Sequence, residues 1–405
     1  MKIISRSFTI IAVGCALFTQ TANADNWITN MDDNVYVTKM SIPGTHDAAT
    51  GEGFGGGLGA ILGPSTAQTQ ELGIGAQWDC GIRAFDLRPT VRGTGEESYL
   101  QIYHGIIETK ISFANALATL RDKLKENPGE FAIVIMRHEN DADSKDGRAW
   151  AELMDECLNA EDISPWLMPF KASMKIGDIR GKILVLSRDT YNNGPVGGYI
   201  TSWSHSSDFT EQRKARVTGT GGIGEFAMVQ DFYDCTGTDG VDTKKATVIN
   251  MLNESIKLKS RRWVINHTSG YTKNASSDGY RDNAAKINQA AIEWLDNKEN
   301  IESVGIIVMD YAGVDQSKTY DVKGLELTNA VIAQNTKTSD TNGITNATAN
   351  NSITIDGRTI TSQGHINVYM PDGRKISSDN VQTSISTKGL YIVRAGNETK
   401  KIYVK

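Results

Sequence analysis

Ser41-Ile42-Pro43-Gly44-Thr45-His46-Asp47 is the stretch around which this chain is organised, a short apolar run that ends in a histidine and an aspartate. Two later stretches, Phe85-Asp86-Leu87-Arg88 and Tyr103-His104-Gly105, also place ionisable side chains where an apolar run stops. Histidine is the side chain whose ordinary pKa lies nearest neutrality, which suits it to proton transfer. We therefore predict that the three stretches build one site.

Short β-rich runs alternate with longer helical ones along most of the chain. Helical spacing of apolar residues fills several gaps between the β-rich runs. The gap between Leu87 and Tyr99 is too short for a helix, so we expect an irregularity there. The pattern predicts an α/β fold, an irregular (β/α)8 TIM-like barrel followed by a small all-β domain. The eight predicted barrel strands are Val35–Met40, Ile82–Leu87, Tyr99–Tyr103, Phe131–Met136, Ile183–Leu186, Phe226–Val229, Trp263–Ile265 and Val304–Val308.

Polar side chains follow each of these predicted strands. In barrels of this type the active site lies at the C-terminal ends of the strands. A charged residue after one buried strand is common by chance, so the argument depends on all eight together. The residues that follow the strands are His46-Asp47, Arg88, His104, Arg137-His138, Arg188, Asp231, Asn266-His267 and Asp310.

The composition changes along the chain predict four segments. Residues 1–24 combine two basic residues, an apolar run and a small-residue cleavage site, as a secretory signal peptide does. Residues 25–334 would form the barrel, and 335–352, rich in Thr, Asn and Ser, a flexible linker. Residues 353–405 alternate apolar and polar residues and predict a β-sandwich-like module. We expect a secreted or cell-surface protein; lipidation at Cys15 is less favoured because the residues before it fit that pattern poorly.

Charge and cysteine content limit the classes of function. The 405-residue chain has a formal net charge of −6, which becomes −8 without the signal segment and its Lys2 and Arg6. Nucleic-acid binders usually present a basic surface, so nucleic acid is not an expected partner. The remaining cysteines, Cys80, Cys157 and Cys235, have neither disulfide-framework nor zinc-site spacing, and one bridge stays open.

The residue types at the predicted barrel mouth suit cleavage of a phosphodiester by an internal hydroxyl. One imidazole, of His46 or His104, would take the proton of the attacking hydroxyl while the other protonates the leaving oxygen. The guanidinium of Arg88 is planar and permanently charged, so it can hold phosphoryl oxygens as negative charge develops. Asp47 and Asp310 are placed to fix the imidazole tautomers.

Several alternatives remain at this stage. His46-Asp47 could cap a loop, Arg88 could solvate a rim, and His with Asp could ligate a cation, although a cation beside Arg88 would be repelled. We favour a metal-independent site. The apolar segment Phe54–Gly63 could be a packed loop, a mobile lid or a rim that contacts lipid. Four further histidines are expected at the surface or in supporting positions: His138, His205, His267 and His365.

At these residues the chain resembles a bacterial phosphatidylinositol-specific phospholipase C. The similarity runs through SIPGTHD at 41–47, GIRAFDLR at 81–88, YHG at 103–105, GKILVLSR at 181–188, VQDFY at 229–233 and GIIVMDY at 305–311. These motifs occur in the family's order over the whole predicted barrel. The C-terminal module, which ends in KKIYVK at 400–405, resembles the sorting tails of type IX secretion.

The resemblance implies a two-step reaction in which the inositol 2-hydroxyl attacks phosphorus and releases diacylglycerol and a 1,2-cyclic inositol phosphate. It implies that His46 is the base, oriented by Asp310, that His104 is the acid, backed by Asp47, and that Arg88 replaces a calcium ion. No cofactor is expected. The residues assigned to the substrate are Arg188, Asp231, Tyr233, Arg137 and Asp86, with Arg137 standing where the family has a lysine.

Two alternatives to this activity remain, a related barrel phosphodiesterase for another head group, such as a glycerophosphodiester, and a catalytically silent lipid-binding surface module. The expected partner is membrane phosphatidylinositol, and glycosyl-phosphatidylinositol anchors are a further candidate. We expect a monomer in peripheral contact with the membrane.

Overall fold

The computed structural model describes residues 26–257, 262–298 and 303–339, and much of 353–404. The chain divides into two compact units, with the boundary between Ser339 and Asp340. The predicted signal segment with Cys15, residues 340–352 of the predicted linker, and His365 lie outside the described residues. Within the described part of the chain, we find no helix with the length and apolar character needed to span a bilayer.

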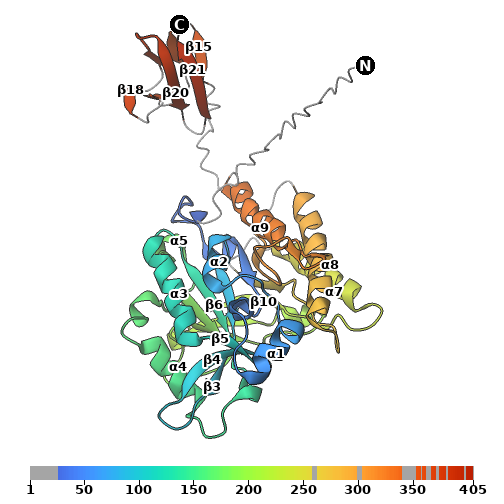
Figure 1. Cartoon of the computed structure of the whole chain (residues 1–405). Coiled ribbons are helices and arrows are strands. Elements are labelled where there is room, and N and C mark those ends of the chain that lie inside the picture. Colours follow the sequence, from blue (N-terminus) through green and yellow to red (C-terminus); the bar gives the residue numbers. More distant parts are fainter. Residues whose placement is uncertain are drawn as a thin grey trace, which may run out of the picture. The chain divides into compact units, whose positions relative to one another are not determined.

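A closed barrel of nine strands forms the centre of the first unit (Figure 1). Neighbouring strands pair in parallel, except that β9 is antiparallel to both of its neighbours. The α/β barrel prediction is therefore confirmed, with nine strands in place of eight. In order around the barrel they are β1 (Ser41–Thr45), β12 (Gly305–Met309), β11 (Trp263–His267), β10 (Gly224–Gln230), β9 (Arg216–Gly219), β8 (Gly198–Thr201), β7 (Ile183–Ser187), β6 (Ala132–Met136) and β2 (Ala84–Leu87).

The prediction that Val35–Met40 forms the first barrel strand was wrong. The centre of this segment is a 3₁₀ helix, η2 (Val37–Lys39), and strand β1 begins one residue after the predicted strand ends. Val37 and Met40 are both buried, and residues three apart lie on one face of a 3₁₀ turn. A helical turn therefore buries here the apolar residues that were assigned to a strand.

The predicted third barrel strand belongs to a different sheet. Strand β4 (Tyr99–His104) pairs with β3 (Pro89–Arg92) and β5 (Ile107–Ser112) in a three-stranded antiparallel sheet. This sheet occupies the interval between β2 and the next helix, where the sequence predicted an irregularity. His104 therefore reaches the site from outside the barrel.

Strands β8 and β9 were not predicted. Each has four residues, and β9 runs into a glycine-rich turn before β10. Runs this short give too little alternation to be distinguished from loop sequence.

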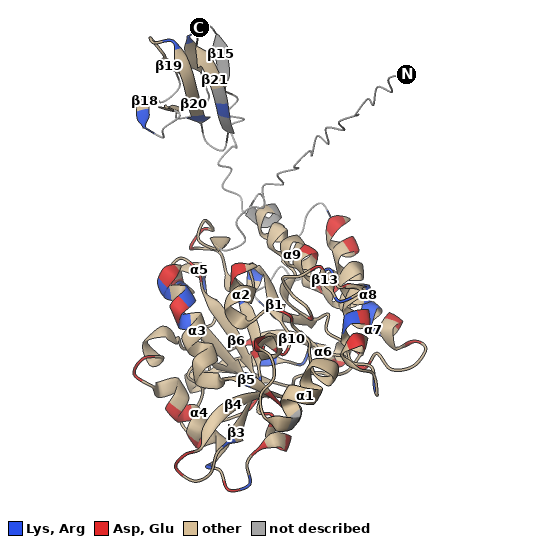
Figure 2. Cartoon of the chain, in the orientation of Figure 1, with Lys and Arg blue, Asp and Glu red and all other residues tan. Residues whose placement is uncertain are grey.

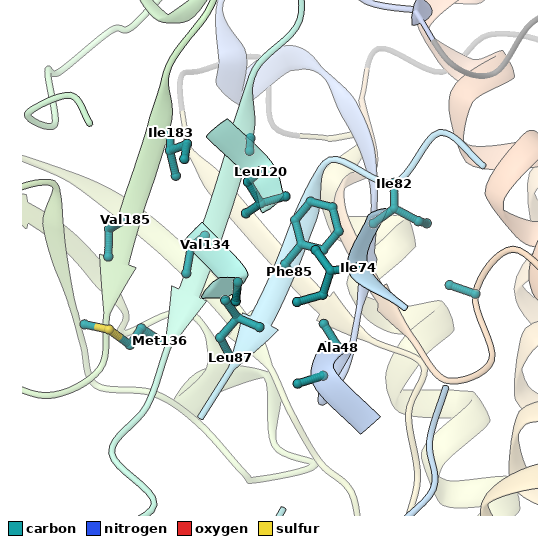
Figure 3. Packing of buried hydrophobic residues seen from close by; sticks show 14 of the residues in the cluster. Ala48, Ile74, Ile82, Phe85, Leu87, Leu120, Val134, Met136, Ile183 and Val185 are labelled. Atoms are coloured by element: carbon teal, nitrogen blue, oxygen red, sulfur yellow. The ribbon is translucent and has the colours of Figure 1, made fainter. Parts of the chain in front are cut away.

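Alternate residues along the barrel strands face two different apolar clusters. Ile133 and Ile135 of β6 pack with a cluster that includes Ile42 and Ile265. The intervening residues face the surrounding helices, as Figure 3 shows for Val134, which lies near Phe85 and Leu120. This alternation follows from the period of two along a strand. It also explains why the strands read as continuous apolar runs, since both faces are buried.

Helix α3 (Phe113–Glu126) shows how the surrounding helices form. Ser112 caps it by accepting a hydrogen bond from the Asn115 backbone N–H, and its buried face carries Phe113, Leu117, Leu120 and Leu124 at helical spacing. Basic and acidic residues are interspersed on its outer face (Figure 2). The other helices are α1 (Gly57–Thr66), α2 (Ile74–Asp79), α4 (Trp150–Asn159), α5 (Ile176–Ile179), α6 (Phe209–Gln212), α7 (Gly240–Ser255), α8 (Ser277–Asp296) and α9 (Gly324–Ser339).

Helix α9 continues to Ser339, so it extends past residue 334 into the segment predicted as a linker. Asn335 on this helix is buried and donates a hydrogen bond to the Ser41 carbonyl oxygen, while its own side-chain oxygen accepts from the Ser41 N–H. These contacts tie the last helix to the first barrel strand. A polar composition alone did not indicate them.

The second unit contains two small antiparallel sheets, which confirms the predicted all-β module. One sheet is β15 (Thr354–Asp356), β16 (Thr359–Thr361) and β19 (Gln382–Ser384). The other is β18 (Lys375–Asp379), β17 (Ile366–Tyr369), β20 (Gly389–Ala395) and β21 (Glu398–Val404). The core of this second unit includes Ile360, Val368, Tyr391, Val393 and Val404.

Candidate active site

A pocket of about 330 Å³ lies where the predicted site residues converge. Seven of the ten predicted site residues line it, and Asp47, Asp86 and Asp310 lie behind them. Among the other lining residues, Glu139, His205 and Tyr280 were not assigned to the site from sequence. The predicted residues that line the pocket are His46, Arg88, His104, Arg137, Arg188, Asp231 and Tyr233.

His46 is fixed between two carboxylates. Its Nδ1 lies 2.7 Å from Oδ1 of Asp310, and its Nε2 lies 3.1 Å from Oδ2 of Asp47. Its backbone is held by the side chain of Gln70, which donates to the carbonyl oxygens of both His46 and Met309. Gln70 therefore ties the ends of β1 and β12 together, and this function had no signal in the sequence.

Asp47 has a left-handed backbone conformation, with φ at +45°. Aspartate tolerates this region better than most residues, although it remains strained there. The turn directs the carboxylate back into the site, where its other oxygen lies 3.1 Å from Nε of Arg88. One carboxylate thus contacts both a histidine and the arginine.

The two carboxylates raise the pKa of His46 to about 9. Burial opposes this shift because it disfavours the charged imidazolium, but the negative charges of Asp47 and then Asp310 outweigh it. Arg88 also opposes the shift. In the free site His46 therefore holds a proton at neutral pH.

His104 lies on the other side of Asp47, with the centres of the two imidazole rings 6.2 Å apart. Its Nε2 is 3.5 Å from Oδ2 of Asp47, so the predicted pairing is present but longer than a hydrogen bond. Its Nδ1 lies 2.7 Å from the backbone carbonyl oxygen of Ala67, at the end of helix α1. The closer partner is thus a carbonyl group that sequence reasoning missed.

Arg88 is held by Asp47 and by Asp86, whose Oδ2 lies 2.9 Å from Nη2. Burial would lower the pKa of Arg88, but Asp47, Asp86 and Glu139 keep it well above the ordinary value. Asp86 was predicted to bind substrate; the structure instead places it behind Arg88, where it is 2% exposed. Despite burial, Arg88 lowers the pKa of Asp86 to about 2, so the pair stays ionised.

A second group of polar side chains in the pocket comes from the ends of β7 and β10. Asp231 accepts a hydrogen bond from Nε1 of Trp203 at 2.8 Å, and the guanidinium of Arg188 lies 4.1 Å from the centre of the Trp203 ring system. Tyr233 is 46% exposed and can present its ring to a ligand. Arg137 is partly exposed, and its Nη1 is 3.7 Å from Glu139.

The remaining described histidines have different surroundings. His138 stacks on Trp150 and contacts Asp143 at 2.8 Å, in the supporting position that was predicted. His267 is buried beside His46, and burial lowers its pKa to about 3 even though Asp231 opposes the shift. His205 lines the pocket, and this position went beyond the sequence prediction.

His46, Asp47 and Asp86 offer ligand atoms that lie within 4.8 Å of one another. A cation there would compete with the guanidinium of Arg88, which already pairs with both carboxylates. Among the described residues, Cys157 and Cys235 form no disulfide, so no bridge joins any two of Cys80, Cys157 and Cys235.

Residues 63–189 match the family model described as phosphatidylinositol-specific phospholipase C, X domain. The resemblance predicted from the sequence is thereby confirmed. The matched segment of this phospholipase C-like chain contains Arg88, His104, Arg137 and Arg188, while His46, Asp231 and Asp310 lie outside it. The family model thus covers one part of the geometric site.

Relatives extend the likeness over the barrel. A 1-phosphatidylinositol phosphodiesterase of Listeria monocytogenes is 26% identical over 288 residues, covering 70% of this chain and 80% of the relative. A protein of the same description from Staphylococcus aureus is 23% identical and covers 71% and 88%.

Solved structures show the same fold. A crystal structure of the phosphatidylinositol-specific phospholipase C of Staphylococcus aureus aligns with a TM-score of 0.61 at 19% identity, covering 76% of this chain and 97% of that one. The enzyme from Listeria monocytogenes aligns with a TM-score of 0.55 at 21% identity, covering 77% and 98%.

Proposed function

We propose that this chain is a phosphatidylinositol-specific phospholipase C that forms diacylglycerol and a 1,2-cyclic inositol phosphate without a metal ion. One observation carries the proposal: the Nε2 atoms of His46 and His104 lie 3.1 Å and 3.5 Å from the same carboxylate oxygen, Oδ2 of Asp47. The paired arginine Arg88 contacts the other oxygen of that carboxylate. This arrangement supports the assignment of an acid, a base and a fixed positive charge to neighbouring positions in the pocket.

The reaction follows from these positions. Nε2 of His46, once deprotonated, takes the proton of the inositol 2-hydroxyl as its oxygen attacks phosphorus. The bond from phosphorus to the glycerol oxygen breaks, and Nε2–H of His104 gives its proton to that oxygen. Arg88 donates hydrogen bonds to the non-bridging oxygens as their negative charge grows. Asp310 stabilises the imidazolium that forms on His46.

The residues from the ends of β7 and β10 that line the pocket support a polyol as the substrate head group. Asp231 can accept hydrogen bonds from ring hydroxyls, Arg188 can donate them, and Tyr233 offers a flat apolar surface. Arg137 is a further donor at the rim. A glycerophosphodiester would leave most of these groups without a partner, which costs free energy at a desolvated site. This set of contacts favours phosphatidylinositol over that alternative head group and over a silent binding module.

The apolar segment Phe54–Gly63, for which a packed loop, a lid and a lipid-contacting rim were left open, is in large part a helix, α1. Its exposed side chains favour contact with a membrane surface. Ile61 on this helix is 74% exposed and Leu62 is 38% exposed, while Phe54 before it is buried. Exposed apolar side chains on a short helix can enter the interfacial region of a bilayer. We propose that α1 makes this contact in an exported, monomeric enzyme and that glycosyl-phosphatidylinositol anchors are further substrates.

The test gives purified protein vesicles of phosphatidylinositol or phosphatidylcholine in excess chelator and follows products by phosphorus NMR. The expected result is a cyclic inositol phosphate from phosphatidylinositol alone. Absence of this product would overturn the activity, and loss of turnover on chelation would overturn the metal-free mechanism. A glycosyl-phosphatidylinositol-anchored protein, scored by its release from vesicles, tests the further substrate.

A further inference from the structure

The segment after β8 contains a histidine, His205, that lies between two of the residues proposed to bind the inositol ring. These residues, Arg188, Asp231 and Tyr233, are here called the polyol-binding group. Arg188, after β7, and Asp231, after β10, are too far apart for a direct hydrogen bond, with Nη1 and Oδ2 separated by 4.0 Å. His205 fills this interval. Its Nε2 lies 3.3 Å from Nη2 of Arg188, and its Nδ1 lies 3.2 Å from Oδ2 and 3.1 Å from the carbonyl oxygen of Asp231.

The chemistry of the neighbours fixes the tautomer of His205. A guanidinium donates hydrogen bonds and has no acceptor, so Nε2 must accept from Arg188. The carboxylate and carbonyl oxygens of Asp231 accept, so Nδ1–H must donate. These contacts describe a neutral imidazole that passes a hydrogen bond from Arg188 to Asp231.

The ring of His205 also packs against Tyr233, the third residue of the polyol-binding group. It packs edge-on, with ring centres 5.3 Å apart and an interplanar angle of 79°. Its side chain is 45% exposed and lines the pocket. One side chain therefore contacts Arg188, Asp231 and Tyr233, which come from the ends of two different strands.

We propose that His205 is a positioning residue for head-group recognition, which in its neutral form with hydrogen on Nδ1 joins Arg188 and Asp231 into one hydrogen-bonded unit. The proposal rests on the proposed function, because it assigns these residues to the inositol ring. It predicts that His205 acts on substrate binding rather than on the proton transfers at His46 and His104.

The charges around His205 give the proposal a pH dependence. Arg188 also faces Arg88 and Arg137, and Asp231 also faces His267. Protonation of His205 would remove the acceptor at Nε2. It would also place another positive charge beside the three arginines, Arg188, Arg88 and Arg137. Asp231 would attract the new charge, but Arg188 would lose the hydrogen-bond acceptor at Nε2 of His205. Substrate binding should therefore weaken in acid.

The experiment compares His205→Ala and His205→Gln with the wild-type chain. A glutamine amide provides a donor and an acceptor without titrating, so it can replace both contacts. His138→Gln, which changes a histidine beside Asp143 outside the pocket, is the matched control. Steady-state turnover of phosphatidylinositol is measured from about pH 5 to 8, the range in which histidine changes charge. Calorimetry measures the binding of myo-inositol, and thermal unfolding checks the fold.

For His205→Ala we expect a KM about tenfold higher, with kcat changed less than about threefold, as for loss of a hydrogen bond to a charged group. His205→Gln should retain the wild-type KM near pH 8. The ratio of the wild-type KM to that of His205→Gln should rise toward acid pH. Equal KM in His205→Ala and wild type, a fall in kcat alone, or a ratio constant with pH would overturn the proposal.

One further measurement does not depend on turnover. Nitrogen NMR of the imidazole at about pH 8 should show His205 protonated at Nδ1 and not at Nε2, with the signal assigned by its loss in His205→Gln. Protonation at Nε2 would overturn the hydrogen-bonded arrangement. If wild-type protein neither cleaves phosphatidylinositol nor binds myo-inositol, the proposed function fails, whereas a normal wild type with unaffected variants contradicts the inference about His205.

Discussion

The backbone carbonyl oxygen of Ala67 lies 2.7 Å from Nδ1 of His104. A carbonyl oxygen accepts hydrogen bonds, so Nδ1–H donates and Nε2 is left to face Asp47 and the pocket. Ala67 is the C-cap of helix α1, which carries the exposed Ile61 and Leu62. The helix proposed to contact lipid therefore also orients the imidazole of the proposed acid, so that Nε2 is the nitrogen that can exchange a proton.

The proposed acid function of His104 predicts a dependence on the leaving group. His104→Ala should lower kcat on phosphatidylinositol by roughly 10²- to 10⁴-fold, the range for one general acid or base. With a p-nitrophenyl inositol phosphate, whose leaving group needs no proton, much of the loss should disappear. His46→Ala should be impaired on both substrates. Equal impairment of His104→Ala on both substrates would argue against the acid function.

The raised pKa of His46 predicts the pH profile. The proposed base must be deprotonated, so kcat/KM should rise with pH through an apparent pKa near 9. Asp310→Asn removes a negative charge that raises this pKa, so the rise should move to lower pH while the maximal rate falls. A profile whose acid limb does not move in Asp310→Asn would mean that another group controls it.

Arg88 should not tolerate replacement by lysine. The guanidinium contacts Asp47 and Asp86 at the same time, and one ammonium cannot reproduce that planar geometry. Arg88→Lys should lower kcat by roughly 10²- to 10³-fold, as for loss of a donor to developing negative charge. Thermal unfolding checks that the fold persists, and near-normal kcat would remove Arg88 from phosphate stabilisation.

Helix α1 predicts a separation of membrane binding from chemistry. Ile61→Ser with Leu62→Ser should weaken binding to phosphatidylinositol vesicles by about tenfold or more, since each side chain loses apolar area buried in lipid. Turnover of a soluble inositol phosphodiester should change little. Ile223→Ser, at an exposed residue before β10 and therefore at the opposite end of that strand from the site, is the matched control. Vesicle sedimentation measures binding, and unchanged binding in the double variant would contradict the interface.

Breaking the buried ion pair between Arg83 and Glu130 should strongly lower the stability of the fold. Arg83 and Glu130 are both fully buried, with Nε 2.9 Å from Oε2, and Arg83 also stacks on Trp78. Glu130→Ala should lower the free energy of unfolding by about 3–5 kcal/mol, because it removes the buried carboxylate that pairs with the guanidinium of Arg83. Urea denaturation measures this change. The double variant Arg83→Met with Glu130→Leu should be more stable than Glu130→Ala, and the reverse order would contradict the explanation.

The sequence alone predicted the class of the fold and which residues converge at the pocket. Buried parallel strands need apolar residues on both faces, so their ends appear in the sequence as abrupt changes to His46, Arg88, Asp231 or Asp310. The alternating C-terminal segment likewise predicted its own sheets. These signals are local, because they depend on neighbours along one strand.

The tertiary structure decided how those residues are connected. The delivery of His104 by a separate sheet, the sharing of Asp47 between His46 and Arg88, and the placement of His205 depend on contacts between residues far apart in sequence. The carbonyl group of Ala67 has no side-chain signature, and a strand as short as β8 leaves almost no periodicity. Hydrogen bonds formed by the folded backbone therefore decided which neighbours orient each functional group.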